Sequence, residues 1–180
     1  MNQTKIITAT VIGTAGLWLL YKALNPTEKF PVIKNFSPSK YLGKWYEIAR
    51  IDFRHEQHMK NVTAHYSLNP DGSIRVENRG YNYKKGIYEG AVGKAKLAGQ
   101  PGKGKLKVSF FGPFYSDYNI LDVDPGYQYA LVAGKNHDYL WILSRQTIIP
   151  EDVKMAYLQK AGKLGYDTDR LTWVSHNGMK

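Results

Sequence analysis

The sequence predicts an all-β domain of short strands joined by hairpins, with one α-helix near its C-terminal end. Three observations support this prediction. Apolar and polar residues alternate in many short stretches, turn-forming residues separate these stretches about every 8–12 residues, and residues 150–164 show helical spacing. Such a pattern indicates a β-sandwich or an up-and-down barrel. A chain of 180 residues with an aromatic share of 13% is large enough for one domain with a substantial core.

An apolar segment precedes this domain. Residues 6–24 carry Lys22 as their one charged residue, and Trp18 and Tyr21 suit a membrane interface. Because about 20 apolar residues cross a bilayer, we assign residues 1–28 as a signal or membrane-anchor segment. An uncleaved membrane helix is favoured over a cleaved signal, since no small-x-small site follows the run. Either interpretation places the rest of the chain on the extracytoplasmic side of a membrane.

The remaining chain divides into two parts. Pro26 and Pro31 mark a short extended stretch, and we assign residues 29–36 as a linker and residues 37–177 as the folded domain. Within the domain, residues 62–68 alternate with period 2, and a turn at residues 69–72 follows them. The same pattern predicts eight strands, at residues 45–51, 62–68, 74–79, 91–97, 106–110, 118–123, 127–133 and 139–144.

A single helix follows the strands. Pro150 and the acids after it mark its start, and Gly165 marks its end. Four apolar residues at helical spacing form one stripe that should pack on the sheet: Val153, Tyr157, Ala161 and Leu164. Residues 171–174 are a last short strand.

Eight strands suffice for a barrel that holds one small ligand. Small residues on the expected inner face favour space over a solid core: Ala49, Ala64, Ala91, Gly93 and Ala95. Counting alternate residues inward from Trp45 predicts a ligand-binding lining of Glu47, Ala49, Ala64, Tyr66, Val76, Asn78, Ala91, Gly93, Leu106, Val108, Phe110, Tyr129, Leu131, Trp141 and Leu143. For each apolar residue, plain core packing is the alternative.

Two of these lining residues are polar. Glu47 and Asn78 could confer specificity, and a buried Glu47 must be paired or protonated. The loop between the first two strands, residues 52–60, should border the open end of the barrel. It contains Phe53, His55, His58 and Met59, and its Arg54 or Lys60 could meet a phosphate or carboxylate of a ligand. A solvated basic loop is the alternative.

Composition excludes several classes of site. The sequence has no cysteine, which excludes disulfides, thiolate metal sites and a cysteine nucleophile. The formal net charge of +10 favours an anionic membrane surface as a partner over nucleic acid, because the basic residues are scattered along the strands. Residues 55–58 read His-Glu-Gln-His, which lacks the His spacing of a helical zinc site. We therefore expect no metal and no cofactor.

Several motifs resemble those of the lipocalin family. Gly43-Lys44-Trp45 resembles its G-x-W signature, Asp122-Val123-Asp124 with Tyr127 its second motif, and Arg145 its third. Residues 78–81 (Asn-Arg-Gly-Tyr) and 110–114 (Phe-Phe-Gly-Pro-Phe) are similar to bacterial lipocalins, which are relatives of apolipoprotein D. The resemblance covers about residues 35–176.

This resemblance implies an eight-stranded antiparallel calyx, closed at one end, that binds a fatty acid or lysophospholipid for membrane maintenance and is not an enzyme. It implies structural roles for Gly43, Trp45, Asp124 and Arg145, with Arg145 lying across the indole of Trp45. A homodimer is plausible for the family. Many bacterial members carry a lipidated N-terminal cysteine, which this sequence lacks. In our interpretation the apolar segment therefore replaces the lipid anchor. The inner and the outer membrane both remain possible sites of attachment.

Two other functions remain as alternatives. A calyx-based enzyme would need an ionisable cluster inside the barrel, for which Glu47 is the strong candidate. A haem- or pigment-binding lipocalin would use His65 as a ligand, although the alternation turns His65 outward.

Overall fold

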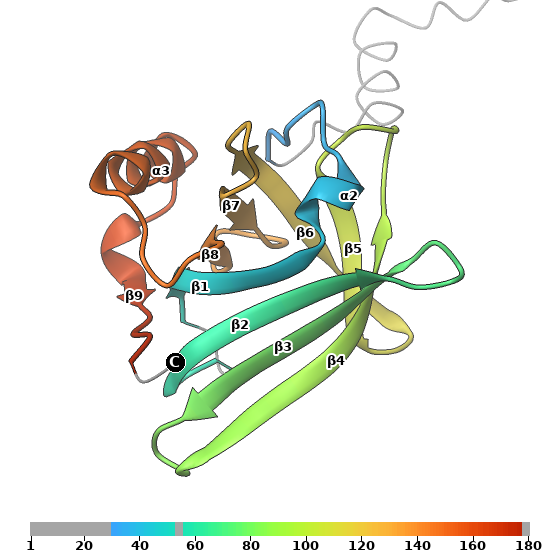
Figure 1. Cartoon of the computed structure of the whole chain (residues 1–180). Helices are drawn as coiled ribbons and strands as arrows, with labels where there is room; N and C mark the ends of the chain where they lie inside the picture. The colour runs from blue at the N-terminus through green and yellow to red at the C-terminus, as the bar shows by residue number, and fades with distance from the viewer. Residues whose placement is uncertain (1–29, 53–55, 178–180) are drawn as a thin grey trace, which may run out of the picture.

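The computed structural model describes residues 30–52 and 56–177 and shows a closed antiparallel β-barrel with a helix packed on its outside (Figure 1). Eight strands form the barrel: β1 (Gly43–Ile51), β2 (Met59–Leu68), β3 (Ile74–Asn82), β4 (Ile87–Leu97), β5 (Lys105–Phe111), β6 (Phe114–Val123), β7 (Tyr129–Ala133) and β8 (Leu140–Ser144). The other elements are α2 (Pro38–Tyr41), α3 (Glu151–Lys163), a 3₁₀ turn η1 (Thr168–Arg170) and β9 (Leu171–Trp173).

The strands follow one another around the barrel. Each of β2 to β7 pairs with the next strand in sequence, and β1 closes the ring by pairing with both β8 and β2. All these pairings are antiparallel, as hairpin connections require. The predicted up-and-down barrel and its eight strands are therefore confirmed, whereas α2 and η1 were not predicted.

β1 does not stay beside β2 over its whole length. It pairs with β2 from Gly43 to Tyr46 and then, from Ala49 to Ile51, pairs with β9. A β-bulge between Glu47 and Ala49 accompanies this change. The chain after β9 continues into the gap, where the backbone NH of Asn61 donates to the carbonyl of Ser175 at 2.9 Å. The C-terminal segment thus runs between β1 and β2 where these strands separate.

The helix α3 covers the outer face of β7, β8 and β1 (Figure 1). Its predicted apolar stripe is confirmed: Tyr157 and Ala161 are buried against the sheet, and Val153 and Leu164 pack partly buried beside them. We call this layer the outer cluster; its buried members are Phe30, Ile48, Ala49, Ile51, Leu121, Leu131, Ala133, Leu140, Ile142, Tyr157, Ala161, Tyr166 and Leu171.

A second apolar cluster lies inside the barrel. This inner cluster has as buried members Phe36, Tyr41, Trp45, Tyr66, Ile74, Val76, Ala95, Leu106, Val108, Ile120, Tyr127, Ala130, Val132 and Leu143. The helix α2 lies over one end of the barrel, where its Tyr41 packs on Trp45 with ring centroids 4.8 Å apart. That end is closed by side chains, and the opposite end is open.

The N-terminal expectations have two outcomes. The predicted membrane helix lies outside the described residues, and among residues 30–52 and 56–177 no helix is long and apolar enough to cross a membrane. Residues 30–36, assigned to the linker, form no helix or strand but pack on the barrel: Phe30 and Phe36 are buried, and the NH of Ile33 donates to the carbonyl of Ile120 at 3.0 Å. The boundary of the folded domain, predicted at residue 37, remains a prediction.

Candidate functional site

The barrel encloses a cavity of about 560 Å³ that opens at the end opposite α2. Ten of the residues predicted from alternation line it: Glu47, Ala64, Tyr66, Val76, Asn78, Ala91, Val108, Phe110, Trp141 and Leu143. Apolar and aromatic side chains dominate this set, and the volume falls within the roughly 300–1,000 Å³ of small-molecule sites. Their contact with a ligand remains a prediction.

Three predicted lining residues point the other way. Ala49, Tyr129 and Leu131 belong to the outer cluster under α3, so the expectation that they face the cavity is wrong. On β1 the bulge after Glu47 shifts the alternation by one residue, which brings Arg50 inward in place of Ala49. On β7 the helix covers the outer face, so both faces are apolar and hydrophobicity cannot distinguish them.

Two further predicted residues are absent from the cavity lining. Leu106 is a fully buried member of the inner cluster and fills the interior with its own side chain. Gly93 leaves room for its neighbour: a Cβ at this position would lie 2.7 Å from the ring of Phe110. The small residue at position 93 therefore accommodates the Phe110 ring, which itself lines the cavity.

The closed end is built around Trp45 and Arg145. The guanidinium carbon of Arg145 lies 3.8 Å from the centroid of the Trp45 ring, as the resemblance implied. Its nitrogens donate to the backbone carbonyls of Lys40, Leu42 and Lys44 at 2.7–2.9 Å. These bonds tie α2 to the end of β8 and close the barrel beneath the cavity.

The other two signature residues also support the closed end. Asp124 accepts hydrogen bonds from the NH groups of Gly126, Gln128 and Tyr129 at 2.6–2.9 Å, which fixes the turn between β6 and β7. Gly43 has a φ of +92°, a conformation that favours glycine, and a Cβ there would lie 3.4 Å from Arg145. Both observations agree with structural roles.

Three tyrosine hydroxyls meet in the deep part of the barrel. The hydroxyl of Tyr118 lies 2.7 Å from that of Tyr41 and 2.9 Å from that of Tyr66. Burial raises the pKa of Tyr66 to about 12 and the pKa values of Tyr41 and Tyr118 well above the ordinary range. All three hydroxyls therefore remain neutral. Tyr66 and Tyr118 line the cavity, whereas Tyr41 does not.

A second polar group extends from the wall to the mouth of the cavity. Arg50 is buried and pairs with Glu47 at 2.7 Å and with Asp52 at 2.6 Å. Glu56 lies 3.9 Å from the same guanidinium and accepts a hydrogen bond from the indole NH of Trp141 at 3.1 Å. One buried cation thus faces three carboxyl groups, of which Glu47 is buried, Glu56 is partly buried and Asp52 is exposed.

The carboxyl groups respond to this burial. Desolvation raises the pKa of Glu56 well above its usual range, and the nearby charge of Glu47 raises it further. Desolvation also raises the pKa of Glu47, although Arg50 opposes the shift. The side-chain oxygen of Asn78 is buried and has no hydrogen-bond partner among the described residues. The cavity therefore offers a carboxyl at Glu56 whose ionised form is disfavoured by burial, and an acceptor at Asn78 without a partner among the described residues.

Sequence reasoning did not identify Arg50, Glu56 and Tyr118 as site residues. Arg50 turns inward because of the bulge, which no residue pattern in β1 predicts. Glu56 lies in a loop, where alternation carries no information. Tyr118 was detectable, since it occurs two residues before the buried Ile120 within a predicted strand.

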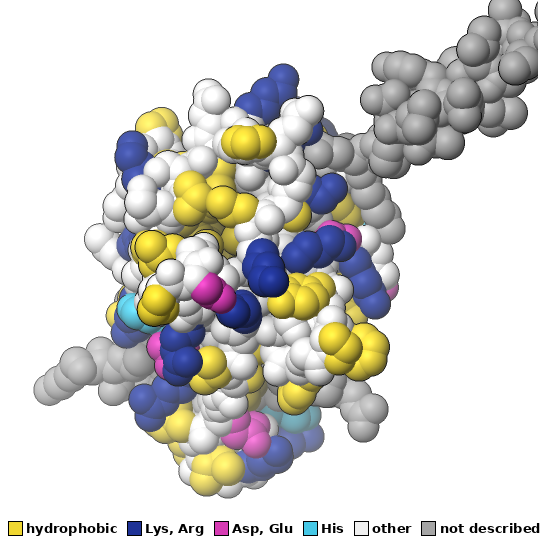
Figure 2. Space-filling model, turned by 90° about the vertical axis from the view of Figure 1, so that its right-hand side faces the viewer, with side chains coloured by type: hydrophobic (Ala, Val, Ile, Leu, Met, Phe, Trp, Pro, Cys, Tyr) yellow, Lys and Arg dark blue, Asp and Glu magenta, His cyan; other side chains and the backbone are white. Residues whose placement is uncertain are grey.

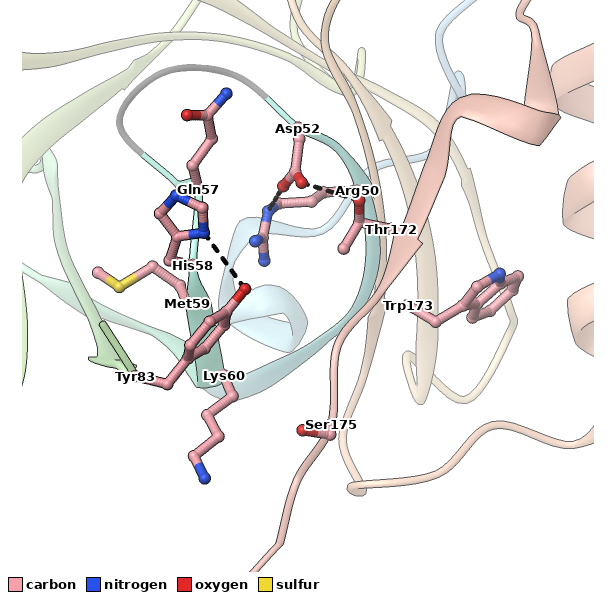
Figure 3. Close-up of a pocket in the computed structure, with 10 residues that line it drawn as sticks. All are labelled: Arg50, Asp52, Gln57, His58, Met59, Lys60, Tyr83, Thr172, Trp173 and Ser175. Carbon is pink, nitrogen blue, oxygen red and sulfur yellow. Dashed lines mark hydrogen bonds and ion pairs between the residues drawn. The ribbon is translucent and has the colours of Figure 1, made fainter. Parts of the chain in front are cut away.

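A smaller cavity of about 440 Å³ lies beside the barrel where β1 and β2 separate (Figure 3). Arg50, Asp52, Met59, Lys60 and Thr172 line it, with Gln57, His58, Tyr83, Trp173 and Ser175. Lys60, expected at the mouth of the barrel, therefore faces this side cavity, whereas Met59 lines both cavities. Phe53, Arg54 and His55 lie outside the described residues.

Comparisons with known proteins agree with this architecture. A family model described as a lipocalin-like domain matches residues 37–176. The chain is 46% identical over 170 residues to the outer membrane lipoprotein Blc of Escherichia coli (strain K12), covering 93% of this chain and 96% of that protein. It is 36% identical over 138 residues to apolipoprotein D of Rattus norvegicus, covering 72% and 70% of the two chains.

Solved structures show the same fold. Insecticyanin from the tobacco hornworm Manduca sexta matches with a TM-score of 0.69 and 21% sequence identity, covering 83% of this chain and 85% of that one. At this identity the likeness concerns the fold alone.

Proposed function

The chain belongs to the lipocalin family, and from this premise we propose that its cavity binds a single-chain lipid, a fatty acid or a lysophospholipid, which the protein carries or stores for membrane maintenance. The observation that carries the proposal is the open cavity of about 560 Å³ with its apolar wall. We propose a binding protein in preference to an enzyme.

The wall suits an acyl chain because apolar and aromatic side chains make up much of it. Val76, Val108 and Leu143 face the cavity from three strands, and the rings of Phe110 and Trp141 add flat apolar surface. A chain that buries on the order of 300 Å² of apolar surface gains about 7 kcal/mol before the costs of association. Micromolar affinity therefore needs few additional polar contacts.

One polar group in the wall favours a ligand whose head carries a hydrogen-bond donor. The side-chain oxygen of Asn78 is an acceptor without a partner among the described residues, and Asn78 lines the cavity. A lysophospholipid has a free hydroxyl that can donate to this acceptor, whereas the carboxylate of a fatty acid cannot donate. Among single-chain lipids, this asymmetry favours the lysophospholipid.

The relatives support a location at a membrane. The similar proteins from Escherichia coli are outer membrane lipoproteins by name. We infer that this chain too works at a membrane, with its barrel on the extracytoplasmic side. A membrane helix within residues 1–28 is our proposed means of attachment.

The test is native mass spectrometry of the purified full chain, followed by extraction and identification of any bound molecule. The proposal predicts a bound mass equal to one fatty acid or lysophospholipid per chain, released by organic extraction. A porphyrin or another pigment would overturn it in favour of the haem- or pigment-binding alternative. His65, considered earlier as a haem ligand, lies on the outer face 3.8 Å from Glu77.

A preparation without bound ligand is then titrated with lysophosphatidylethanolamine and with oleic acid. Saturable binding of neither lipid would also overturn the proposal. Tighter binding of the lysophospholipid is expected, and Asn78→Leu should reduce that preference because it removes the acceptor.

A further inference from the structure

Two hairpin tips at the open end of the barrel expose large apolar side chains. Phe111 and Phe114, on the tip between β5 and β6, are 78% and 79% exposed. Tyr83 and Ile87, on the tip between β3 and β4, are 55% and 52% exposed. Both tips lie on the lower side of Figure 1, away from α2. Exposed phenylalanine rings are costly in water, so a rim of this kind indicates a contact surface.

This rim is continuous with the opening of the cavity. Phe111 and Phe114 both line the cavity as well as facing outward. A surface that seats on the rim would therefore adjoin the cavity directly. We call Tyr83, Ile87, Phe111 and Phe114 the mouth rim.

Basic side chains lie around the mouth rim. Lys84 and Lys85 are exposed in the same turn as Tyr83, and Lys135 is exposed at the turn between β7 and β8, where it lines the cavity. Of these, Lys85 is paired with Glu89 at 2.7 Å. Figure 2 shows one face of the barrel on which apolar side chains are interspersed with more basic than acidic ones. The whole chain carries a formal net charge of +10.

We propose that the mouth rim seats the open end of the barrel on an anionic lipid bilayer. Phenylalanine and tyrosine rings favour the interface between headgroups and acyl chains, and lysines beside them attract anionic headgroups. A second copy of this chain fits less well, because a symmetric contact would bring each basic rim against the same basic rim. This contact goes beyond the proposed ligand site, and each can hold or fail without the other.

The absence of cysteine from the sequence allows a site-specific test in the full chain. Single cysteines at the rim, Ile87→Cys and Phe114→Cys, are labelled with the environment-sensitive fluorophore NBD. Matched controls are Leu68→Cys at the end of β2 and Ile148→Cys after β8, positions that are 64% and 71% exposed at the closed end. Each labelled protein is mixed with vesicles of phosphatidylethanolamine and phosphatidylglycerol.

The proposal predicts a blue shift and an increase of at least about twofold in NBD emission at positions 87 and 114, quenched by spin-labelled lipids, with little change at positions 68 and 148. The rim signal should fall in vesicles without phosphatidylglycerol, and also when the salt concentration rises from about 0.05 to about 0.5 M. Because each label reports its own position, the result does not depend on what else holds the chain at the vesicle.

Three results would overturn the proposal. Equal responses at the rim and control positions would mean that the rim is not the contact. The same response of the position-87 label to monomeric lysophospholipid alone would mean that ligand entry, not a bilayer, causes it. A rim signal that rises with protein concentration without vesicles, together with a dimer mass, would assign the rim to a second copy. Failure of lipid binding in the cavity would leave the vesicle response unchanged, so the two proposals are tested separately.

Discussion

The inner and outer clusters of the barrel are built from similar residues on opposite faces of the same strands. Leu131 on β7 belongs to the outer cluster and Leu143 on β8 to the inner one, and the two are 0% and 4% exposed. The outer cluster is a solid layer between the sheet and α3, whereas the inner cluster borders a cavity of about 560 Å³. The helix accounts for the difference, because it fills one side of the sheet with side chains and leaves the other side hollow.

This comparison separates stability from binding. A side chain in a solid layer has neighbours on every side, whereas a side chain on a cavity wall lacks packing partners on one side. Changes in the outer cluster should therefore act mainly on the free energy of unfolding. Changes on the inner face should act mainly on the ligand.

The largest expected difference comes from removing the same side chain on the two faces. Leu131→Ala should lower the free energy of unfolding by about 3–5 kcal/mol, because it opens a hole in a solid layer. Leu143→Ala should cost about 2 kcal/mol, since it enlarges a space that already exists. Equilibrium urea denaturation of both variants measures the difference. Equal losses would contradict the distinction between a solid and a hollow face.

A pH series tests the buried carboxyl on the inner face. The pKa of Glu56 is raised in the folded protein, so protonation of this carboxyl stabilises the folded state. This contribution is fully present below the unfolded pKa of about 4.3. That contribution is lost as the pH rises through the folded pKa. As the pH rises over this window, the free energy of unfolding of wild type should therefore fall relative to that of Glu56→Gln, by up to about 1.4 kcal/mol per pH unit.

A control of opposite sign lies on the outside of the barrel. A hydrogen bond from Arg75 lowers the pKa of Glu77, so its contribution is present at neutral pH and is lost as the pH falls. Denaturation of Glu77→Gln over the same pH series should give a difference that changes in the opposite direction. A flat difference for Glu56→Gln would show that the carboxyl is not desolvated.

A smaller effect separates two tyrosines of the outer cluster. The hydroxyl of Tyr157 is buried without a hydrogen-bond partner among the described residues, whereas that of Tyr166 donates to the carbonyl of Tyr139 at 3.3 Å. Tyr157→Phe should raise the free energy of unfolding by about 1 kcal/mol, and Tyr166→Phe should lower it by about 0.5–1 kcal/mol. Thermal and urea denaturation measure both, and a loss of stability in Tyr157→Phe would contradict the assignment.

The same two faces explain how far the sequence could be interpreted. On β3 one face is the cavity wall and the other meets solvent, so Val76 and Asn78 were placed correctly from alternation. On β7 both faces are buried, and Tyr129 and Leu131 were assigned to the wrong face. Alternation of apolar and polar residues shows which face of a strand is buried only where the other face is exposed to solvent.

Local irregularities account for the remaining errors. The bulge that turns Arg50 inward and Ala49 outward depends on pairing between β1, β8 and β9, which distant parts of the chain determine. The fold itself was predictable, because turns and strand lengths are local and the motifs around Trp45, Asp124 and Arg145 pointed to the family. The position of Glu56 over the cavity depends on a loop, and no local rule places it.

The most direct test of the hollow interior is to fill it. Ala91 lines the cavity, and its neighbour Val92 lies outside and is 52% exposed. Wild type, Ala91→Trp and Val92→Trp, each as the full chain, are titrated with the fluorescent fatty acid cis-parinaric acid. The titrations compare the effect of a large side chain at the two positions. Wild type and Val92→Trp should bind about one molecule per chain with micromolar Kd, and Ala91→Trp should bind at least about tenfold more weakly with its circular dichroism unchanged. Equal binding by all three proteins would contradict a ligand site inside the barrel.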